Sequence, residues 1–199
     1  MIASSGMSTP PPGSWVENPA RVALALFQPD IPQNTGTLLR LGACLGVPVH
    51  IIAPAGFVIS DRRLRRAGLD YLPHAVRVHH DDWTAFQTWA RQEHRRIVLL
   101  TTRAETAYTD LIYLKGDVLL LGRESAGVPE AVHRQADCRA CIPVAAGCRS
   151  LNQAVAGAMV LGEALRQLAG FPDSPDGEQD NDGHRLEAEQ LGGRCGHLG

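Results

Sequence analysis

The chain has 199 residues, of which 44% are hydrophobic and 20% are charged, and its formal net charge is −2. No apolar run approaches the ~20 residues that a membrane span needs, and five cysteines without a paired spacing argue against a disulfide-stabilised secreted domain. The composition therefore indicates a cytoplasmic protein with one globular domain.

The two ends of the chain differ in composition from its centre. Residues 1–19 are rich in Ser, Pro and Gly, and residues 172–199 hold seven acidic residues but only two arginines. We expect both segments to be disordered tails, because neither has the periodic apolar pattern that builds a core. The remaining domain, residues 20–171, has 17 basic and 13 acidic residues and a net charge of +4. This charge is compatible with a nucleic-acid partner.

Short apolar runs alternate with helical patterns in the first half of this domain. Arg21–Phe27 is a nearly continuous apolar run, which is typical of a buried parallel strand. Leucines at helical spacing follow it, and Gly46 provides a helix stop. The sequence predicts strands at Arg21–Phe27, Val49–Ile52 and Val76–His79, a helix from near Asn34 to Leu45, a helix at Asp61–Ala67, and a helix that starts at Asp81 or Asp82.

The second half of the domain continues the alternation. The predicted strands are Ile97–Leu100, Val118–Leu121 and Cys141–Val144, and the predicted helices are a short one from Pro129 and a long one at Leu151–Leu168. Strands that alternate with helices in this way favour parallel pairing. We therefore predict an α/β fold with a mostly parallel sheet flanked by helices on both faces.

Two of the predicted strands, Val118–Leu121 and Cys141–Val144, end in loops of small and polar residues. Ligands of α/β proteins bind at such strand ends, because backbone N–H and C=O groups are free there. After the first of them, Gly122 permits a close backbone approach to a ligand, and Glu124 adds a carboxylate. Taken alone, the same loop is an ordinary turn into the next helix.

Two further motifs contain polar residues near predicted helix starts. The pattern N-x-G-x-x-x-R extends from Asn34 to Arg40, and Ser150 and Asn152 precede the long helix. Taken alone, the first motif is a helix cap followed by a solvent-facing arginine, and the second is a helix capped by Ser150 or Asn152. Neither motif by itself indicates a reaction.

Together the three motifs resemble the SPOUT class of RNA methyltransferases. Within this class they are most similar to the family that methylates the ribose 2′-OH of the tRNA wobble nucleotide. The resemblance covers Arg21 to Gly170 and includes N-x-G-x-x-x-R, L-G-x-E-x-x-G-V-P, and I-P followed by S-L-N. It implies a C-terminal trefoil knot, which is a rare topology. It also implies S-adenosylmethionine as methyl donor, a homodimer, and the tRNA anticodon stem-loop as partner.

Carried over by position, the resemblance implies two groups of site residues. The donor-binding group is Leu100, Gly122, Ile142 and Ser150, and the catalytic group is Asn34, Arg40, Glu124 and Asn152. One departure from the pattern is Gln153-Ala154-Val155, where relatives often have Leu-Ser-Asn. We therefore expect the polar contacts of that Ser and Asn to be missing here.

Arg40 is the residue that, by similarity, would activate the 2′-OH. A guanidinium stays protonated at neutral pH and offers no acceptor, so a base role requires strong desolvation. Binding the adjacent phosphate and orienting the ribose suits an arginine better. Either role predicts that Arg40→Ala abolishes methylation while S-adenosylmethionine still binds.

Contact with the tRNA backbone is assigned to a cluster of arginines on the predicted helix after Ser60. The cluster is Arg62, Arg63, Arg65 and Arg66. A solvated helix face explains the same pattern equally well. Cys138 and Cys141 form a C-x-x-C pair that lacks a second pair of ligands, so we expect no metal site.

Three alternatives remain beside methylation of the wobble nucleotide. They are 2′-O-methylation at another tRNA or rRNA position, a non-catalytic knotted module that binds RNA, and a Rossmann-like nucleotide-binding enzyme. The retained Asn34, Arg40 and Glu124 speak against the non-catalytic module. The missing glycine fingerprint after the first strand speaks against the Rossmann-like enzyme.

Overall fold

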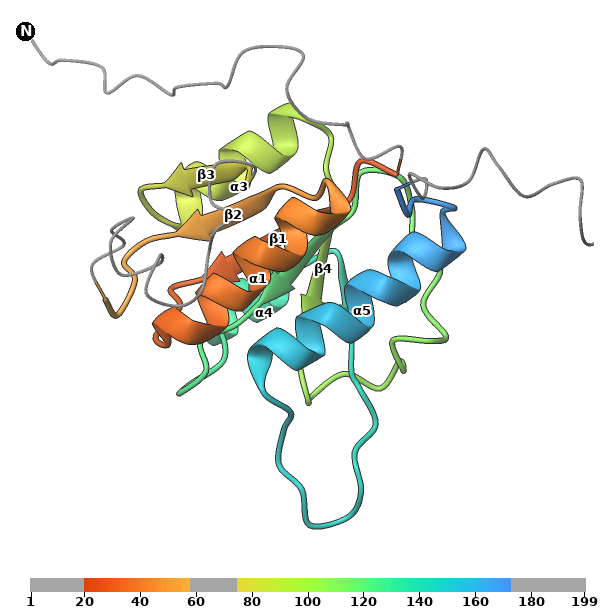
Figure 1. Cartoon of the computed structure of the whole chain (residues 1–199). Helices are drawn as coiled ribbons and strands as arrows, with labels where there is room; N and C mark the ends of the chain where they lie inside the picture. Colours follow the sequence, from red (N-terminus) through yellow and green to blue (C-terminus); the bar gives the residue numbers. More distant parts are fainter. Residues whose placement is uncertain (1–19, 58–74, 173–199) are drawn as a thin grey trace, which may run out of the picture.

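The structure of the chain is a computed structural model that describes residues 20–57 and 75–172 (Figure 1). The elements in chain order are β1 (Ala23–Phe27), α1 (Pro32–Leu45), β2 (Val49–Ile52), β3 (Arg77–His80), α3 (Trp83–Gln92), β4 (Ile97–Leu100), β5 (Val118–Leu121), α4 (Glu130–Gln135), β6 (Cys138–Ala140) and α5 (Gln153–Gln167). The predicted helix at Asp61–Ala67, the predicted tail at 1–19 and all but the first residue of the predicted tail at 172–199 lie outside the described residues. Within the described ranges, no helix has the length and apolar character to cross a membrane.

The strands form one parallel sheet in the order β3-β2-β1-β5-β4-β6. β1 lies inside the sheet, where Leu24 is opposite Val49 of β2 and Leu119 of β5. Because the strands run in one direction, their carboxyl ends lie along the same edge. The chain builds one half of the sheet as β1, β2 and β3 and then crosses to the other half. The order of the strands therefore reverses beside β1, which is where such sheets bind ligands.

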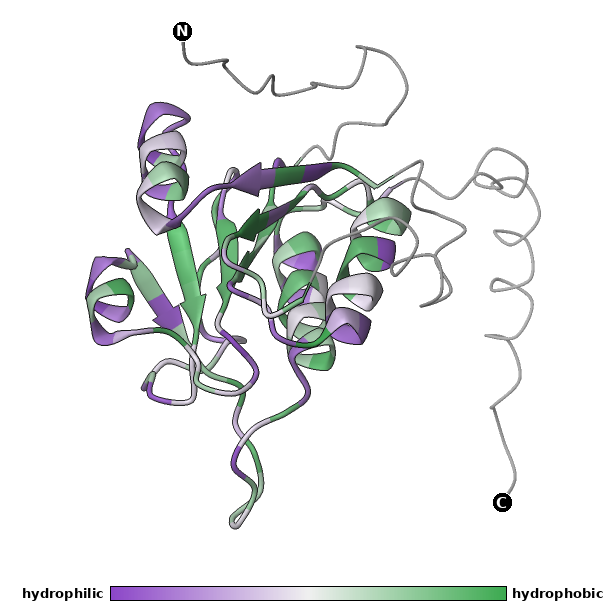
Figure 2. Cartoon of the chain, turned by 90° about the vertical axis from the view of Figure 1, so that its left-hand side faces the viewer, coloured by the Kyte–Doolittle hydropathy of each residue, from purple (hydrophilic) through white to green (hydrophobic). Residues whose placement is uncertain are grey.

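Helices cover both faces of the sheet, as the sequence predicts. Successive residues of a strand point to opposite faces, so Leu24 and Leu26 belong to the core beneath α1 and α5, whereas Ala25 and Phe27 belong to the core beneath α3 and α4. Figure 1 shows α1 and α5 side by side in front of the sheet. In Figure 2 the hydrophobic colouring concentrates on the central strands between the helices.

Close packing of α5 depends on Gly157. A Cβ at this position would lie 2.7 Å from Cδ2 of Leu38 on α1 and 3.2 Å from Cδ2 of Leu121 on β5. Both distances are tighter than a Cβ normally tolerates, so a larger residue would push the helix outward. The glycine thus lets α5 approach α1 and the carboxyl end of β5 together. This approach brings the N-terminus of α5 to the edge of the sheet where ligands bind.

Two helix ends follow the signals in the sequence. Gly46 ends α1 in the left-handed conformation, with a φ angle of 64°. Asp82 caps α3, because its side chain accepts a hydrogen bond of 2.7 Å from the backbone N–H of Ala85. Both helix ends depend on residues that are close in the chain, so the sequence is sufficient to predict them.

The predicted strand at Cys141–Val144 is wrong. The sixth strand is Cys138–Ala140, and beyond it Cys141 forms an isolated bridge to Ala107. Pro143 has no N–H with which to continue a hydrogen-bonded ladder. The segment after β6 is therefore irregular, and α5 begins at Gln153 rather than Leu151.

Two histidines are buried side by side where β2 pairs with β3. His50 Nδ1 lies 2.9 Å from His80 Nε2, and the ring centroids of His50 and Trp89 are 4.0 Å apart. Burial, followed by the neighbouring histidine, lowers the pKa of His50 to about 3, and burial lowers the pKa of His80 as well. Both rings are therefore neutral at pH 7, and one donates a hydrogen bond to the other.

Candidate active site

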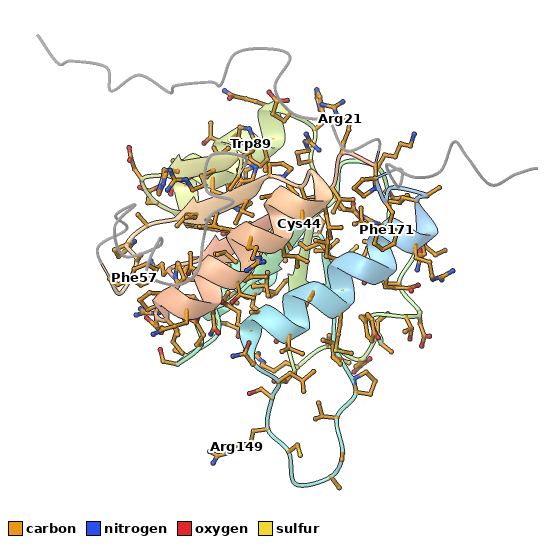
Figure 3. The ribbon with its side chains drawn as sticks, in the orientation of Figure 1. Arg21, Cys44, Phe57, Trp89, Arg149 and Phe171 are labelled. Atoms are coloured by element: carbon orange, nitrogen blue, oxygen red, sulfur yellow. The ribbon has the colours of Figure 1, made fainter. Side chains whose placement is uncertain are left out.

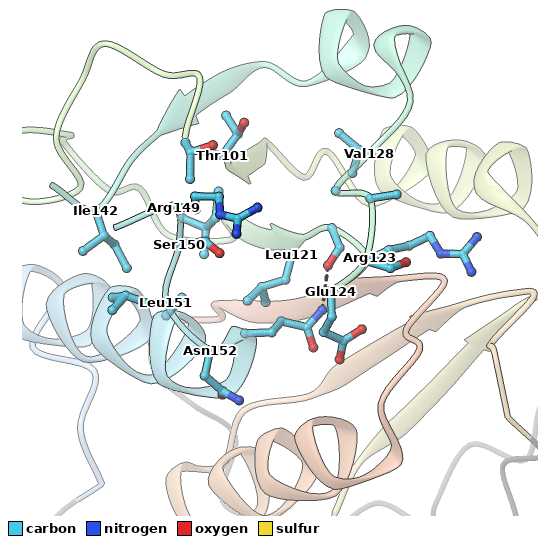
Figure 4. Close-up of a pocket in the computed structure, with 18 of the residues that line it drawn as sticks. Thr101, Leu121, Arg123, Glu124, Val128, Ile142, Arg149, Ser150, Leu151 and Asn152 are labelled. Atoms are coloured by element: carbon cyan, nitrogen blue, oxygen red, sulfur yellow. Dashed lines mark hydrogen bonds between the residues drawn. The ribbon is translucent and has the colours of Figure 1, made fainter. Parts of the chain in front are cut away.

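A cavity of about 650 Å³ lies at the carboxyl ends of β4 and β5, beside the segment that joins β6 to α5 (Figure 4). This volume is within the range of small-molecule sites. The predicted donor-binding residues all line it: Leu100, Gly122, Ile142 and Ser150. Among the predicted catalytic residues, Asn34, Glu124 and Asn152 line it and Arg40 does not.

The three catalytic candidates that line the cavity form one hydrogen-bonded network. Asn34 Nδ2 donates to Glu124 Oε1 at 3.0 Å, and Asn152 Nδ2 donates to Asn34 Oδ1 at 2.9 Å. These residues come from α1, from the loop after β5, and from the residue before α5. The network therefore joins three motifs that are far apart in the sequence.

Asn152 has a second role as the N-cap of α5. Its Oδ1 accepts hydrogen bonds from the backbone N–H groups of Ala154 and Val155, at 2.8 and 3.2 Å. Its amide nitrogen is thereby turned towards Asn34. Asn34 itself is not a helix cap, because it lies inside α1 and Ile31 occupies the N-cap position. The amide of Asn34 is buried and serves the network instead.

Gln153 is a site residue that sequence reasoning missed. Its side chain is buried and lines the cavity, and its Nε2 donates a hydrogen bond of 2.7 Å to the backbone oxygen of Gly122. Its Oε1 has no hydrogen-bond partner among the described residues. The departure from the family pattern at this position therefore supplies a polar contact instead of removing one. The glutamine side chain is long enough to reach the loop after β5.

The loop after β5 is a tight turn built on two glycines. Arg123 and Gly127 exchange backbone hydrogen bonds of 2.9 and 2.8 Å. A Cβ on Gly122 would lie 2.7 Å from the backbone carbon of Gly127, and Gly127 has a φ angle of +66°. Both positions therefore require glycine. The turn leaves Glu124, Ser125 and the backbone of Gly122 along the wall of the cavity.

A second set of contacts fastens this turn to the segment between β1 and α1. Asp30 accepts a hydrogen bond of 2.6 Å from Arg123 Nη2 and another from the hydroxyl of Ser125, and its own N–H donates to Glu124 Oε2 at 2.8 Å. The hydrogen bonds from Arg123 and Ser125 lower the pKa of Asp30 to about 2. No signal in the sequence points to Asp30, since it lies between two prolines in what the pattern predicts as a simple break.

The predicted reaction centre is only partly assembled within one chain. Arg40 is exposed on α1, nearly two turns beyond Asn34, or about 9 Å along the helix axis. The arginine cluster at Arg62, Arg63, Arg65 and Arg66 lies outside the described residues, so its assignment stays a prediction. Other arginines lie closer to the cavity: Arg103 and Arg149 both line it and are exposed. Figure 3 shows Arg149 on the segment that projects beyond the N-terminus of α5.

Residues 20–57 and 75–172 contain no group of three or more His, Cys, Asp or Glu side chains arranged to hold a metal ion. Within these ranges Cys138 and Cys141 are half-buried free thiols. The cavity is lined instead by apolar side chains, amides, hydroxyls, glycine backbone, three arginines, one histidine and one carboxylate, Glu124. This combination suits the binding and orientation of polar organic ligands.

Comparison with known proteins places this site in a family. The SpoU rRNA methylase family matches residues 21–162. A tRNA (cytidine(34)-2′-O)-methyltransferase of Ancylobacter novellus is 59% identical over 150 residues, which are 75% of this chain and 95% of the relative. The Escherichia coli protein of the same name is 39% identical over 151 residues, or 75% of this chain and 94% of the relative.

Solved structures show the same likeness. A structure that gives insight into the 2-OH methylation of C/U34 on tRNA superposes with a TM-score of 0.72 and 41% identity, covering 76% of this chain and 99% of the other. A rRNA methyltransferase of Sinorhizobium meliloti with AdoMet bound superposes with a TM-score of 0.69 and 25% identity, covering 77% of this chain and 61% of the other.

Proposed function

The chain belongs to the SpoU rRNA methylase family, and on this basis we propose that it transfers a methyl group from S-adenosylmethionine to the ribose 2′-oxygen of nucleotide 34 of tRNA. The target is cytidine or a uridine, as in the relatives and the solved structure named for that reaction. The observation that carries the proposal is the network of Asn34, Glu124 and Asn152. It joins the three motifs at the wall of one cavity.

The residues that line the cavity fit a methyl donor of this kind. Leu100 and Ile142 offer apolar surface, Ser150 offers a hydroxyl, and Gly122 lines the same cavity. The unpartnered Oε1 of Gln153 is an acceptor suited to an amino group of the ligand. When bound, S-adenosylmethionine supplies an electrophilic methyl group on a sulfonium, and no metal is needed for its transfer.

The task left to the protein is to align the ribose 2′-oxygen with that methyl group. Positioning of this kind can account for much of a rate enhancement. The network holds the carboxylate of Glu124 and the amides of Asn34 and Asn152 in fixed directions, so they form a preorganised polar wall. Arg40 binds a phosphate beside the target and orients the ribose, because a guanidinium matches phosphate geometry and keeps its charge.

A homodimer explains why Arg40 lies outside the cavity of its own chain. Val155 and Met159 on α5 are 50% and 37% exposed, and Leu41 and Cys44 of α1 lie on the neighbouring helix with partly or fully exposed side chains. Apolar residues on two adjacent helices are typical of an interface between identical subunits. We propose that this surface pairs with its copy and brings Arg40 to the partner's cavity.

The trefoil knot is also part of the proposal. Two contacts link the C-terminal segment to the connection between β4 and β5. Cys141 N–H donates to Thr106 O at 2.9 Å, and Gln167 Nε2 donates to Leu111 O at 3.0 Å. Gln167 Oε1 also accepts from the N–H of Tyr113 at 3.1 Å. These contacts support a chain path in which α5 passes through that connection.

Direct assay of the product tests the proposed function. The purified chain is incubated with S-adenosylmethionine labelled in its methyl group and with tRNA, and the labelled nucleotide is mapped after nuclease digestion. We expect label on the 2′-oxygen of nucleotide 34 in the anticodon stem-loop. Label at another tRNA position would assign a related activity, and binding of tRNA without label would identify a non-catalytic module.

Mixing two inactive variants tests the shared site. In heterodimers of Arg40→Ala and Glu124→Ala, one of the two sites keeps both residues if Arg40 acts on the partner's cavity. We then expect roughly a quarter of the wild-type activity in a random mixture. If Arg40 acts within its own chain, both sites stay defective and the mixture is as inactive as each variant alone.

A further inference from the structure

The segment from Gln28 to Ile31, between β1 and α1, is held in a conformation that its residues rarely adopt alone. Gln28 has a φ angle of 45°, in the left-handed region that side chains other than glycine avoid. Backbone hydrogen bonds of 2.9 Å hold the first two residues of this segment, from Gln28 N–H to Ile52 O and from Gly56 N–H to Pro29 O. Strained backbone of this kind persists where surrounding contacts fix it, and such contacts concentrate at functional sites.

Within this segment, Asp30 contacts three successive residues of the turn that lines the cavity. Its carboxylate accepts from Arg123 Nη2 at 2.6 Å, from Arg123 Nε at 3.2 Å and from the hydroxyl of Ser125, and its backbone N–H donates to Glu124 Oε2 at 2.8 Å. A Cβ on Gly56 would lie only 3.0 Å from Asp30 Oδ1, so this glycine makes room for the carboxylate. Asp30 thus contacts the turn through both its carboxylate and its backbone.

The contacts of Asp30 determine what Glu124 can do. Both oxygens of Glu124 accept hydrogen bonds, one from Asp30 N–H and one from the amide of Asn34. Glu124 is the one carboxylate among the described residues that line the cavity. The neighbouring residue, Arg123, forms an ion pair with Asp30. Figure 4 shows the Arg123 side chain extending away from Glu124 and Asn152. Without the charge of Asp30, the guanidinium would be drawn to Glu124, the nearest remaining carboxylate in the turn.

We propose that Asp30 is a positioning residue for the methyl transfer. It holds Arg123 away from Glu124 and thereby keeps the Glu124 carboxylate on Asn34, in the wall of the cavity. This inference rests on the proposed function. It adds a residue that acts on the reaction through Glu124 without contacting the substrate.

A double-mutant cycle tests this role. Asp30→Asn removes the charge and keeps the shape, and we expect kcat to fall ~10- to 100-fold while KM for S-adenosylmethionine changes little. Arg123→Met removes the misplaced cation, so Asp30→Asn/Arg123→Met is expected to be more active than Asp30→Asn alone. If Asp30 merely stabilised the fold, the double variant would be no better than the single one. That result would overturn the proposal.

A matched control separates this effect from the loss of any ion pair. Glu163 on α5 pairs with Arg166 at 2.8 Å, away from the cavity, and Glu163→Gln is expected to keep wild-type kcat. A crystal structure of Asp30→Asn gives a readout independent of activity: Arg123 should turn to Glu124, and Glu124 should leave Asn34. Glu124 retained on Asn34 in that structure would also overturn the proposal. If the wild-type chain labels no tRNA, the proposed function fails instead, while the structural comparison still tests the contact.

Discussion

Two hydrogen-bonded polar clusters in this molecule lie in different surroundings. The network of Asn34, Glu124 and Asn152 lies at the carboxyl end of the sheet and opens onto a cavity. The pair of His50 and His80 lies inside the sheet at β2 and β3, packed against aromatic rings. Each cluster is held by hydrogen bonds between residues of different elements. Only the first has access to a ligand.

The comparison shows that burial and perturbed chemistry do not by themselves identify a functional site. The histidines have lowered pKa values, but the cause is burial among aromatic side chains, and neither ring lines the cavity of the candidate site. Glu124 lines a cavity together with residues from three motifs. We therefore expect changes in the network to affect activity and changes in the histidine pair to affect stability.

Among the changes that test this difference between the two clusters, Glu124→Gln is expected to have the largest effect on activity. Both Glu124 oxygens accept from N–H donors, so an amide nitrogen in place of one oxygen faces a donor and turns the side chain away. We expect kcat for tRNA methylation to fall ~100-fold, with a change in the free energy of unfolding of about 1 kcal/mol or less. Single-turnover assays and urea denaturation measure the two. Lost stability with normal kcat would contradict the assignment of Glu124 to the site.

The histidine pair is expected to show the opposite behaviour. His50→Leu leaves a buried ring nitrogen of His80 without its partner, which costs about 1–3 kcal/mol of unfolding free energy. kcat should stay at the wild-type value. The double variant His50→Leu/His80→Leu removes both partners and should regain part of the stability. A fall in kcat with unchanged stability would contradict this prediction and would assign the pair a role in activity.

The pH dependence of stability sharpens the same distinction. The folded pKa of His50 is about 3, below the ordinary value of 6.5, so the unfolded chain binds more protons between these values. The stabilisation by the neutral ring is therefore present above pH 6.5 and is lost as the pH falls towards 3. We expect the unfolding free energy to drop by up to about 1.4 kcal/mol per pH unit per histidine in this window. In His50→Leu/His80→Leu this dependence should flatten, which urea titrations at several pH values would detect.

The smallest effect is expected at the rim of the cavity. Arg149 lines it and is exposed, so we expect its guanidinium to contact a tRNA phosphate. Loss of that contact in Arg149→Ala should raise KM for tRNA ~3- to 10-fold. The slope of log affinity against log salt should fall by about 1, because one phosphate contact is lost. Arg91→Ala, on α3 at the other face of the sheet, is the control. An equal rise in KM for tRNA in both variants would contradict a specific contact of Arg149 and would indicate a general effect of the lost positive charge.

Much of the fold followed from local patterns, and the one strand predicted wrongly has a non-local cause. Apolar runs predicted the first five strands within a few residues, and Gly46 and Asp82 marked helix ends through backbone conformation and side-chain capping. Cys141–Val144 has the apolar character of a strand, but hydrogen bonding to β4 ends at Ala140. Composition describes the side chains of a segment, whereas a strand also needs a neighbour for its backbone groups.

The residues of the candidate site also fall into those that the sequence indicated and those that only the structure revealed. The family resemblance implied Asn34, Glu124 and Asn152 as catalytic candidates, because they match its motif positions. Asp30 and Gln153 were not found, since their roles consist entirely of contacts with the turn after β5. The family resemblance implied Arg40, which the structure places in an exposed position on α1 outside the cavity. The proposed homodimer accounts for this position.

By itself the sequence determined the class of fold, the order of most elements, the family resemblance and the residues that carry its motifs. These properties depend on periodicity and on residues that are close in the chain. Tertiary structure alone decided that Asn152 meets Asn34 and that Asp30 holds the turn of Glu124. Partners of this kind are about 90 to 120 residues apart. They meet because the parallel sheet brings its carboxyl ends together and because Gly157 lets α5 pack close to them.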